Sequence, residues 1–164
     1  MSVSNLKDLY VHEIKDLYSA NTQSLEMHQT LAEACTSEEA CAKMDRVLDG
    51  IRDGIKAVET ICDRHGVEPT GERCKGMAGL VTEAKAHATE ADIEDAIVRD
   101  ASIISQSNRM EHYALSGYKS CLAYARALDL EDDAKTLQDC VTGTQSSGDA
   151  LREVVVESSR RAHA

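Results

Sequence analysis

The sequence has 164 residues and contains no phenylalanine, no tryptophan, a single proline and only nine glycines. Its aromatic residues are five tyrosines, which argues against the stacking platforms that bind single-stranded nucleic acid and leaves the core to aliphatic residues and methionine. The scarcity of proline favours long helices. Basic residues are also few, because 18 Lys and Arg stand against 29 Asp and Glu, a net charge of −11. This charge disfavours binding to nucleic-acid phosphates and to anionic membrane surfaces.

The distribution of apolar residues also predicts no targeting or membrane-spanning segment. The first ten residues alternate polar and apolar side chains and include Lys7 and Asp8, whereas a signal peptide needs a continuous apolar stretch. No apolar run approaches the length of a membrane span. We therefore expect a cytoplasmic protein that does not attach to membranes.

The six cysteines do not form a recognisable metal-binding or disulfide pattern. No CxxC motif occurs among them, and their spacing fits no zinc site. In a reducing cytosol they are expected to act as small hydrophobic residues. Cys35 and Cys41 flank a predicted helix-to-helix turn, so an oxidising environment would allow a disulfide between them.

The spacing of apolar residues predicts four long helices. Apolar side chains recur at steps of three and four along one face of each helix, over residues 3–34, 38–65, 93–128 and 131–160. Ser37 followed by two glutamates predicts the start of the second helix. Gly66 and Pro69 predict its end.

The segment 66–92 between the second and third helices contains the only proline and several glycines. We interpret it as a long crossover that carries one short amphipathic helix from Gly76 to Ala88. Two helical hairpins joined by one crossover are typical of the ferritin-like four-helix bundle. The predicted fold is therefore all-α, with a single ferritin-like domain over residues 1–164.

Three segments of the sequence resemble the YciE/YciF family. They are His12–Ala20 (HEIKDLYSA), Cys74–Leu80 (CKGMAGL), and the third-helix residues Arg99–Ala101, Arg109–Tyr113 and Gly117–Tyr118. Their order and spacing hold across about 150 residues. The resemblance implies a ferritin-like bundle, a homodimer and a link to bacterial stress responses. It also implies a carboxylate-and-histidine dimetal centre in the middle of the bundle, although the family's biochemical activity is poorly defined.

Most of the ligand positions that the resemblance implies have been substituted. Asn21 stands where the first helix of the family carries a glutamate, directly after Tyr-Ser-Ala. Counting back from the end of the second helix places Asp49 at a carboxylate position and Arg52 where a histidine is expected. Glu111 is retained on the third helix.

Asp49 and Glu111 are thus the residual metal-ligand candidates, with His28 about two turns from Asn21 on the same face. The permanent charge of Arg52 would replace a cation and neutralise one of these carboxylates. We therefore expect a degenerate site without a di-iron centre and without a cofactor. The alternative is a residual site for iron or manganese.

The fourth helix should supply a carboxylate cluster, but it has Thr142 and Gly143 at the start of a run of small and polar residues that ends at Gly148. Two glycines in the middle of a helix lower its intrinsic stability. We expect this run to pack closely against its neighbours. An open pocket, or a close contact at a dimer interface, is the alternative.

The remaining polar residues of the motifs have less specific expectations. Glu13 and Asp16 are expected to be solvated or to cap a helix, or else to pair with basic residues of the crossover or of a dimer partner. His12 and His112 are expected at the surface or at an interface. Buried hydroxyls usually find a polar partner, and we expect this of Tyr18, Tyr113 and Tyr118.

Three functions are compatible with these features, and no residue is assigned a catalytic role. The favoured one is a non-enzymatic stress-associated protein that acts through assembly or contacts with an unknown protein. The alternatives are an iron or manganese oxidase or peroxide scavenger, and a thiol redox sensor that uses Cys35 and Cys41 or another pair of cysteines. The sequence contains no nucleophilic triad, phosphate-binding loop or dinucleotide fingerprint.

Overall fold

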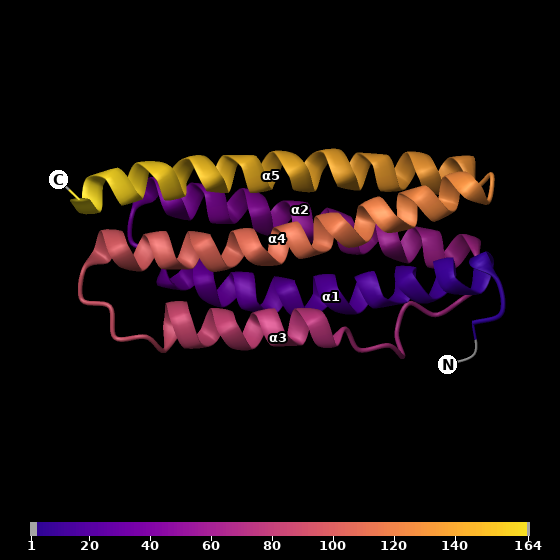
Figure 1. Cartoon of the computed structure of the whole chain (residues 1–164), viewed down its shortest axis with the longest axis horizontal. Helices are drawn as coiled ribbons and strands as arrows, with labels where there is room; N and C mark the ends of the chain where they lie inside the picture. Colours follow the sequence, from indigo (N-terminus) through magenta and orange to yellow (C-terminus); the bar gives the residue numbers. More distant parts are fainter. Residues whose placement is uncertain (1–2, 164) are drawn as a thin grey trace.

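The computed structural model describes residues 3–163 and consists of four long helices and a short one (Figure 1). The helices are α1 (Leu6–Ala34), α2 (Glu38–Arg64), α3 (Lys75–Ala84), α4 (Ala96–Ala127) and α5 (Glu131–His163). A π-helical turn, η1 (Lys85–Thr89), continues α3.

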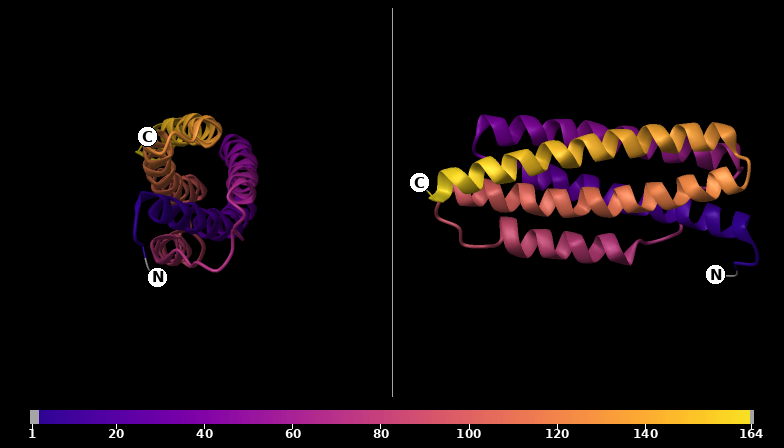
Figure 2. Two further views of the ribbon diagram at one scale, coloured as in Figure 1. Left: turned by 90° about the vertical axis from the view of Figure 1, so that its right-hand side faces the viewer. Right: turned by 45° about the horizontal axis from the view of Figure 1, so that its top comes forward.

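The long helices form a four-helix bundle in which the neighbours are, in order, α1, α2, α5 and α4 (Figure 2). Helices α1 and α2 form one hairpin, and α4 and α5 form the other. The crossover between the hairpins places α3 outside the bundle, against α1 and α4. The predicted all-α, ferritin-like bundle with a helix in its crossover is therefore confirmed.

Side-chain caps explain where the helices begin. The Ser37 hydroxyl accepts a hydrogen bond from the backbone N–H of Ala40 at 3.3 Å, as expected for an N-cap. Helix α4 begins three residues later than predicted because the Asp95 carboxylate accepts hydrogen bonds from the N–H groups of Ile97 and Val98, at 2.8 and 3.0 Å. After α2, Gly66 adopts a φ of +62°, which favours glycine over other residues.

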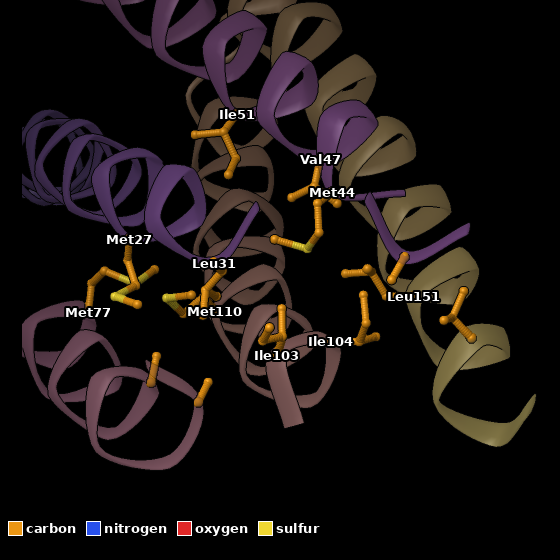
Figure 3. Close-up of a cluster of buried hydrophobic side chains, with 14 of the residues drawn as sticks. Met27, Leu31, Met44, Val47, Ile51, Met77, Ile103, Ile104, Met110 and Leu151 are labelled. Carbon is orange, nitrogen blue, oxygen red and sulfur yellow. The ribbon is translucent and has the colours of Figure 1, made fainter. Parts of the chain in front are cut away.

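The core consists of two clusters, one towards each end of the bundle. The first lies around the α1–α2 turn and is rich in methionine (Figure 3); its large members include Met27, Leu31, Met44, Met77, Ile103, Ile104, Met110 and Leu151. The second lies towards the α4–α5 turn and includes Tyr10, Ile14, Leu17, Val58, Ile61, Leu115, Tyr118, Leu122 and Leu137. Flexible methionines fill the irregular space that phenylalanine would fill in many bundles.

A buried aspartate closes each end of the bundle. At the α1–α2 end, Asp100 accepts hydrogen bonds from the N–H of Thr36 (2.9 Å), the N–H of Ser37 (2.8 Å) and the hydroxyl of Thr36 (3.0 Å). Burial alone would raise the pKa of Asp100, but these hydrogen bonds outweigh it and lower the pKa. Asp100 therefore ties the start of α4 to the α1–α2 turn.

At the opposite end, Asp133 of α5 joins three helices. Its carboxylate accepts hydrogen bonds from the Tyr10 hydroxyl (2.8 Å), Arg64 (3.0 Å) and His65 Nε2 (2.6 Å). Lys7 donates to the other ring nitrogen of His65 at 2.7 Å. Burial opposes ionisation of Asp133, yet its hydrogen bonds to His65, Tyr10 and Arg64 lower its pKa.

Within residues 3–163, no helix combines the length and the apolar character that crossing a membrane requires.

Candidate functional site

A cavity of about 400 Å³ opens between α2 and α5, between the two core clusters. Helices α1 and α4 contribute Asn21, Glu111, Ala114 and Tyr118 to its lining. Helix α2 contributes Gly50, Ile51, Asp53, Gly54 and Ala57. Helix α5 contributes Thr136, Asp139, Cys140, Gly143, Thr144 and Ser147. This volume falls within the range of small-molecule pockets, about 300–1,000 Å³.

Small residues on the two facing helices keep this cavity open. A Cβ atom added to Gly143 would meet no atom within 4 Å, and one added to Gly50 would only touch the Ser147 hydroxyl, at 3.8 Å. Gly54 is different, because an added Cβ would collide with the hydroxyl of Tyr118. Tyr118 thus occupies the space that a side chain at position 54 would need.

Glu111 is the buried carboxyl group of the cavity. It is 4 % exposed and makes no hydrogen bond or ion pair with any residue that the structure describes. Burial raises its pKa from 4.5 to about 8. The Glu111 carboxyl therefore keeps its proton to a higher pH than an exposed glutamate does.

Asn21 and Tyr118 form a hydrogen-bonded pair beside Glu111 in the cavity wall. The Asn21 amide nitrogen donates to the Tyr118 hydroxyl at 2.6 Å, and both side chains are buried. Burial, first of all, raises the pKa of Tyr118, so its hydroxyl remains protonated. The expected polar partner of Tyr118 is thus an amide at the position where the family resemblance implies a metal ligand.

The expected inward placement of Asp49 and Arg52 is wrong. Arg52 does donate to Asp49, at 2.9 Å, but their side chains are 45 % and 76 % exposed, respectively, and neither lines the cavity. Ile51 faces the cavity, and residues two apart on an α-helix point about 200° apart, so Asp49 must face outward. The inward positions of α2 around the cavity are instead Ile51 and Gly54, which are both buried.

The polar run of α5 also divides by helix face. Gly143 and Thr142 are both exposed, but only Gly143 is among the residues that line the cavity; the Thr142 hydroxyl donates to the Gln138 carbonyl at 2.9 Å. Gly148 is buried, and an added Cβ would lie 3.1 Å from the His112 ring. The close packing that we expected occurs at Gly148, while the alternative of an open pocket describes Gly143.

His28 is buried near the cavity but does not line it. Its Nδ1 donates to the Ser24 carbonyl at 2.8 Å, and its Nε2 lies 2.9 Å from the Ser107 hydroxyl, which donates to it. Burial lowers its pKa to about 4. Since both ring nitrogens have partners within the protein, His28 acts as a neutral bridge between α1 and α4.

The other motif residues lie away from the cavity. His12 pairs with Glu72 of the crossover at 3.5 Å, and His112 is exposed, as expected for surface histidines. The Tyr113 hydroxyl lies 3.2 Å from the Cys74 sulfur and so holds α4 to the crossover. Three further residues, Glu13, Asp16 and Tyr18, are half-buried on α1.

All six cysteines are free thiols. Burial, reinforced by the neighbouring Cys41, raises the pKa of Cys35 to about 12. Burial likewise raises the pKa of Cys140, which lines the cavity, to about 11. A raised pKa lowers the thiolate fraction on which cysteine reactivity depends.

The residues present do not fit a di-iron or dimanganese centre. Such centres need several carboxylates and histidines from all four helices, but Glu111 is the sole buried acid of the cavity. Among residues 3–163, no group of three or more His, Cys, Asp or Glu side chains could hold a metal ion. Asn21 and Gly143, which stand at two of the ligand positions that the family resemblance implies, line the cavity without supplying a carboxylate or an imidazole.

Comparison with known proteins relates the whole chain to one family. The model of the family described as "Domain of unknown function (DUF892)" matches residues 5–164. Protein YciF of Escherichia coli (strain K12) is 22 % identical over 157 residues, with 95 % of this chain and 93 % of that protein covered.

Solved structures share the fold. The E. coli stress protein YciF has a TM-score of 0.89 at 23 % identity, with 96 % of this chain and 99 % of that chain covered. YcfI of Rhodopseudomonas palustris has a TM-score of 0.86 at 24 % identity, with 92 % of this chain and 95 % of that chain covered. A ferritin-like, diiron-carboxylate protein from Bacillus anthracis has a TM-score of 0.71 at 10 % identity, with 93 % of this chain and 99 % of that chain covered.

Proposed function

This chain belongs to the DUF892 family, and from that membership we propose that it is a stress-associated, ferritin-like protein whose dimetal site is degenerate. It performs no metal-dependent catalysis and acts through assembly or contacts with other proteins. The similarity to a protein described as the E. coli stress protein YciF supports the association with stress. The cytoplasm is the proposed location.

The single observation that carries this proposal is the isolation of Glu111. One carboxyl group, 4 % exposed and without a protein partner, replaces the several ligands of a dimetal site. Asp49 is turned to solvent and cannot assist it. A dimetal site needs several ionisable ligands close together, but the residues that line this cavity include no second buried acid and no histidine beside Glu111.

The alternatives have weaker support. An oxidase or peroxide scavenger would need an atypical site for iron or manganese in which Glu111 is the only buried acid. A thiol sensor would use Cys35 and Cys41, but the raised pKa of Cys35 keeps its thiol protonated at neutral pH.

We expect the full-length protein, purified from cells supplied with iron and manganese, to contain less than about a tenth of an equivalent of either metal. The reason is the lack of a ligand set around Glu111. Elemental mass spectrometry measures the iron and manganese content per chain. The Bacillus anthracis diiron-carboxylate protein, purified in parallel, is the positive control.

A near-stoichiometric metal content that disappears in Glu111→Ala and persists in Asp49→Ala would overturn the degenerate site. It would support the oxidase alternative, which peroxide consumption by the metal-loaded protein would then test.

A homodimer is the assembly that the proposal expects. Light scattering should give about twice the chain mass of 17.8 kDa at micromolar concentration. A strict monomer under these conditions would contradict assembly as the mode of action.

A further inference from the structure

The cavity of α2 and α5 contains a buried group that the protein itself does not satisfy. Glu111 lines the cavity, is 4 % exposed, and has no hydrogen-bond or ion-pair partner in the described part of the chain. Its carboxyl oxygens are open to the cavity rather than fully enclosed, and holding a carboxyl group in this largely buried place without a protein partner costs free energy. A ligand that supplied a hydrogen-bonded positive charge would remove this cost.

The charges around the cavity have one sign. Its ionisable carboxyl groups are Glu111 inside and Asp53 and Asp139, which are exposed at the mouth, and no Lys, Arg or His is among its lining residues. Lys56 lies 3.5 Å from Asp53, but both side chains are more than 70 % exposed, and such surface pairs are weak. The cavity and the net charge of −11 therefore both favour a cation over an anion.

The acidic groups of the cavity, one buried and two exposed, favour an elongated cation over a metal ion. Glu111, Asp53 and Asp139 do not converge as a metal-binding group, since none of three or more ligands exists within residues 3–163. The lining of the same cavity also includes the apolar side chains of Ile51, Ala57 and Ala114. Methylene groups are the complement of such a wall.

We propose that this cavity binds a small linear organic dication, a diamine or polyamine. One ammonium group lies against the carboxylate of Glu111, and the second lies at the mouth with Asp53 and Asp139. The methylene chain between them contacts the apolar wall. Gly50 and Gly143 make room for the ligand, which gives these glycines a role that the degenerate dimetal site does not require.

The test is calorimetric titration of the full-length protein with putrescine and with spermidine, at pH 8 and low ionic strength. We expect one saturable site per chain in the wild type and binding at least tenfold weaker in Glu111→Gln. Asp49→Asn is the matched control: it removes the same charge from a residue outside the cavity and should leave the affinity within about twofold. Butylamine, with one ammonium group, should bind more weakly than putrescine.

A second variant tests the cavity without changing any charge. Gly143→Leu places a side chain where an added Cβ meets no atom within 4 Å, and leucine is the better helix former, so the variant should fold at least as well as the wild type. We expect it to lose diamine binding.

Three results would each overturn the proposal. They are the absence of a saturable site in the wild type, equal losses in Glu111→Gln and Asp49→Asn, and binding of uncharged butanediol as tight as that of putrescine. None of them bears on the metal content that tests the degenerate site.

Discussion

Asp100→Ala should destabilise the protein by about 3 kcal/mol, because it leaves two backbone N–H groups of the α1–α2 turn without an acceptor. Asp100 is 3 % exposed, and its carboxylate accepts from Thr36 and Ser37 at 2.8–3.0 Å. Hydrogen bonds to a charged acceptor contribute about 1.5–3 kcal/mol, and the buried Asp100 carboxylate accepts three of them. Urea denaturation followed by circular dichroism measures the difference.

Asp95→Ala is the matched control for Asp100. Asp95 also accepts from two backbone N–H groups, those of Ile97 and Val98, but it is exposed at the start of α4. Water can replace it, so the expected loss is about 1 kcal/mol. Equal losses in the two variants would mean that burial of Asp100 does not strengthen its contribution.

Glu111→Gln should stabilise the protein increasingly as the pH rises from 5 to 8. The folded state raises the pKa of Glu111 from 4.5 to about 8, so the folded state holds a proton that the unfolded state has lost in this range. The wild type is therefore penalised by about 1.4 kcal/mol for each pH unit, while glutamine stays neutral. The expected gain is small at pH 5 and on the order of 3–4 kcal/mol at pH 8.

Thermal and urea unfolding of both proteins at several pH values measures this linkage. Asp49→Asn should show no comparable pH dependence, since Asp49 is mostly exposed. A Glu111→Gln effect that is the same at pH 5 and pH 8 would show that the Glu111 carboxyl is not buried in the folded protein.

The neutral His28 changes the pH dependence of stability in the opposite direction to Glu111, because burial lowers its pKa to about 4. The unfolded state binds a proton at this histidine below about pH 6.5, so its contribution to stability is lost as the pH falls. Between pH 4.5 and 6.5 the two groups oppose each other. Above pH 6.5 Glu111 acts alone, and this is the range in which its variant is most informative.

The sequence was sufficient for the fold but not for the orientation of the site residues. Apolar residues at steps of three and four predicted each long helix, and Ser37 and Gly66 marked helix ends that the structure confirms. For Asp49 and Arg52, counting back from a helix end misjudged the face. The apolar stripe through Met44, Ile51 and Val58 already contained the signal that Asp49 faces outward.

Other features had no local signal. The bond from Asn21 to Tyr118 joins residues 97 positions apart, and Asp100 and Asp133 find their partners on other helices. The cavity is lined by small residues of two helices, among them Gly50 of α2 and Gly143 of α5, and a glycine in a sequence does not reveal whether its space is filled.

The sequence by itself determined the all-helical bundle and its crossover, because the periodicity of apolar residues and the chemistry of turn residues are local properties. Only the tertiary structure decided that Glu111 is buried without a partner in an open cavity. Burial and hydrogen bonding depend on side chains that other helices bring together. The absence of phenylalanine and tryptophan therefore predicted which residue types form the core, while the packing of the four helices decided where a cavity interrupts it.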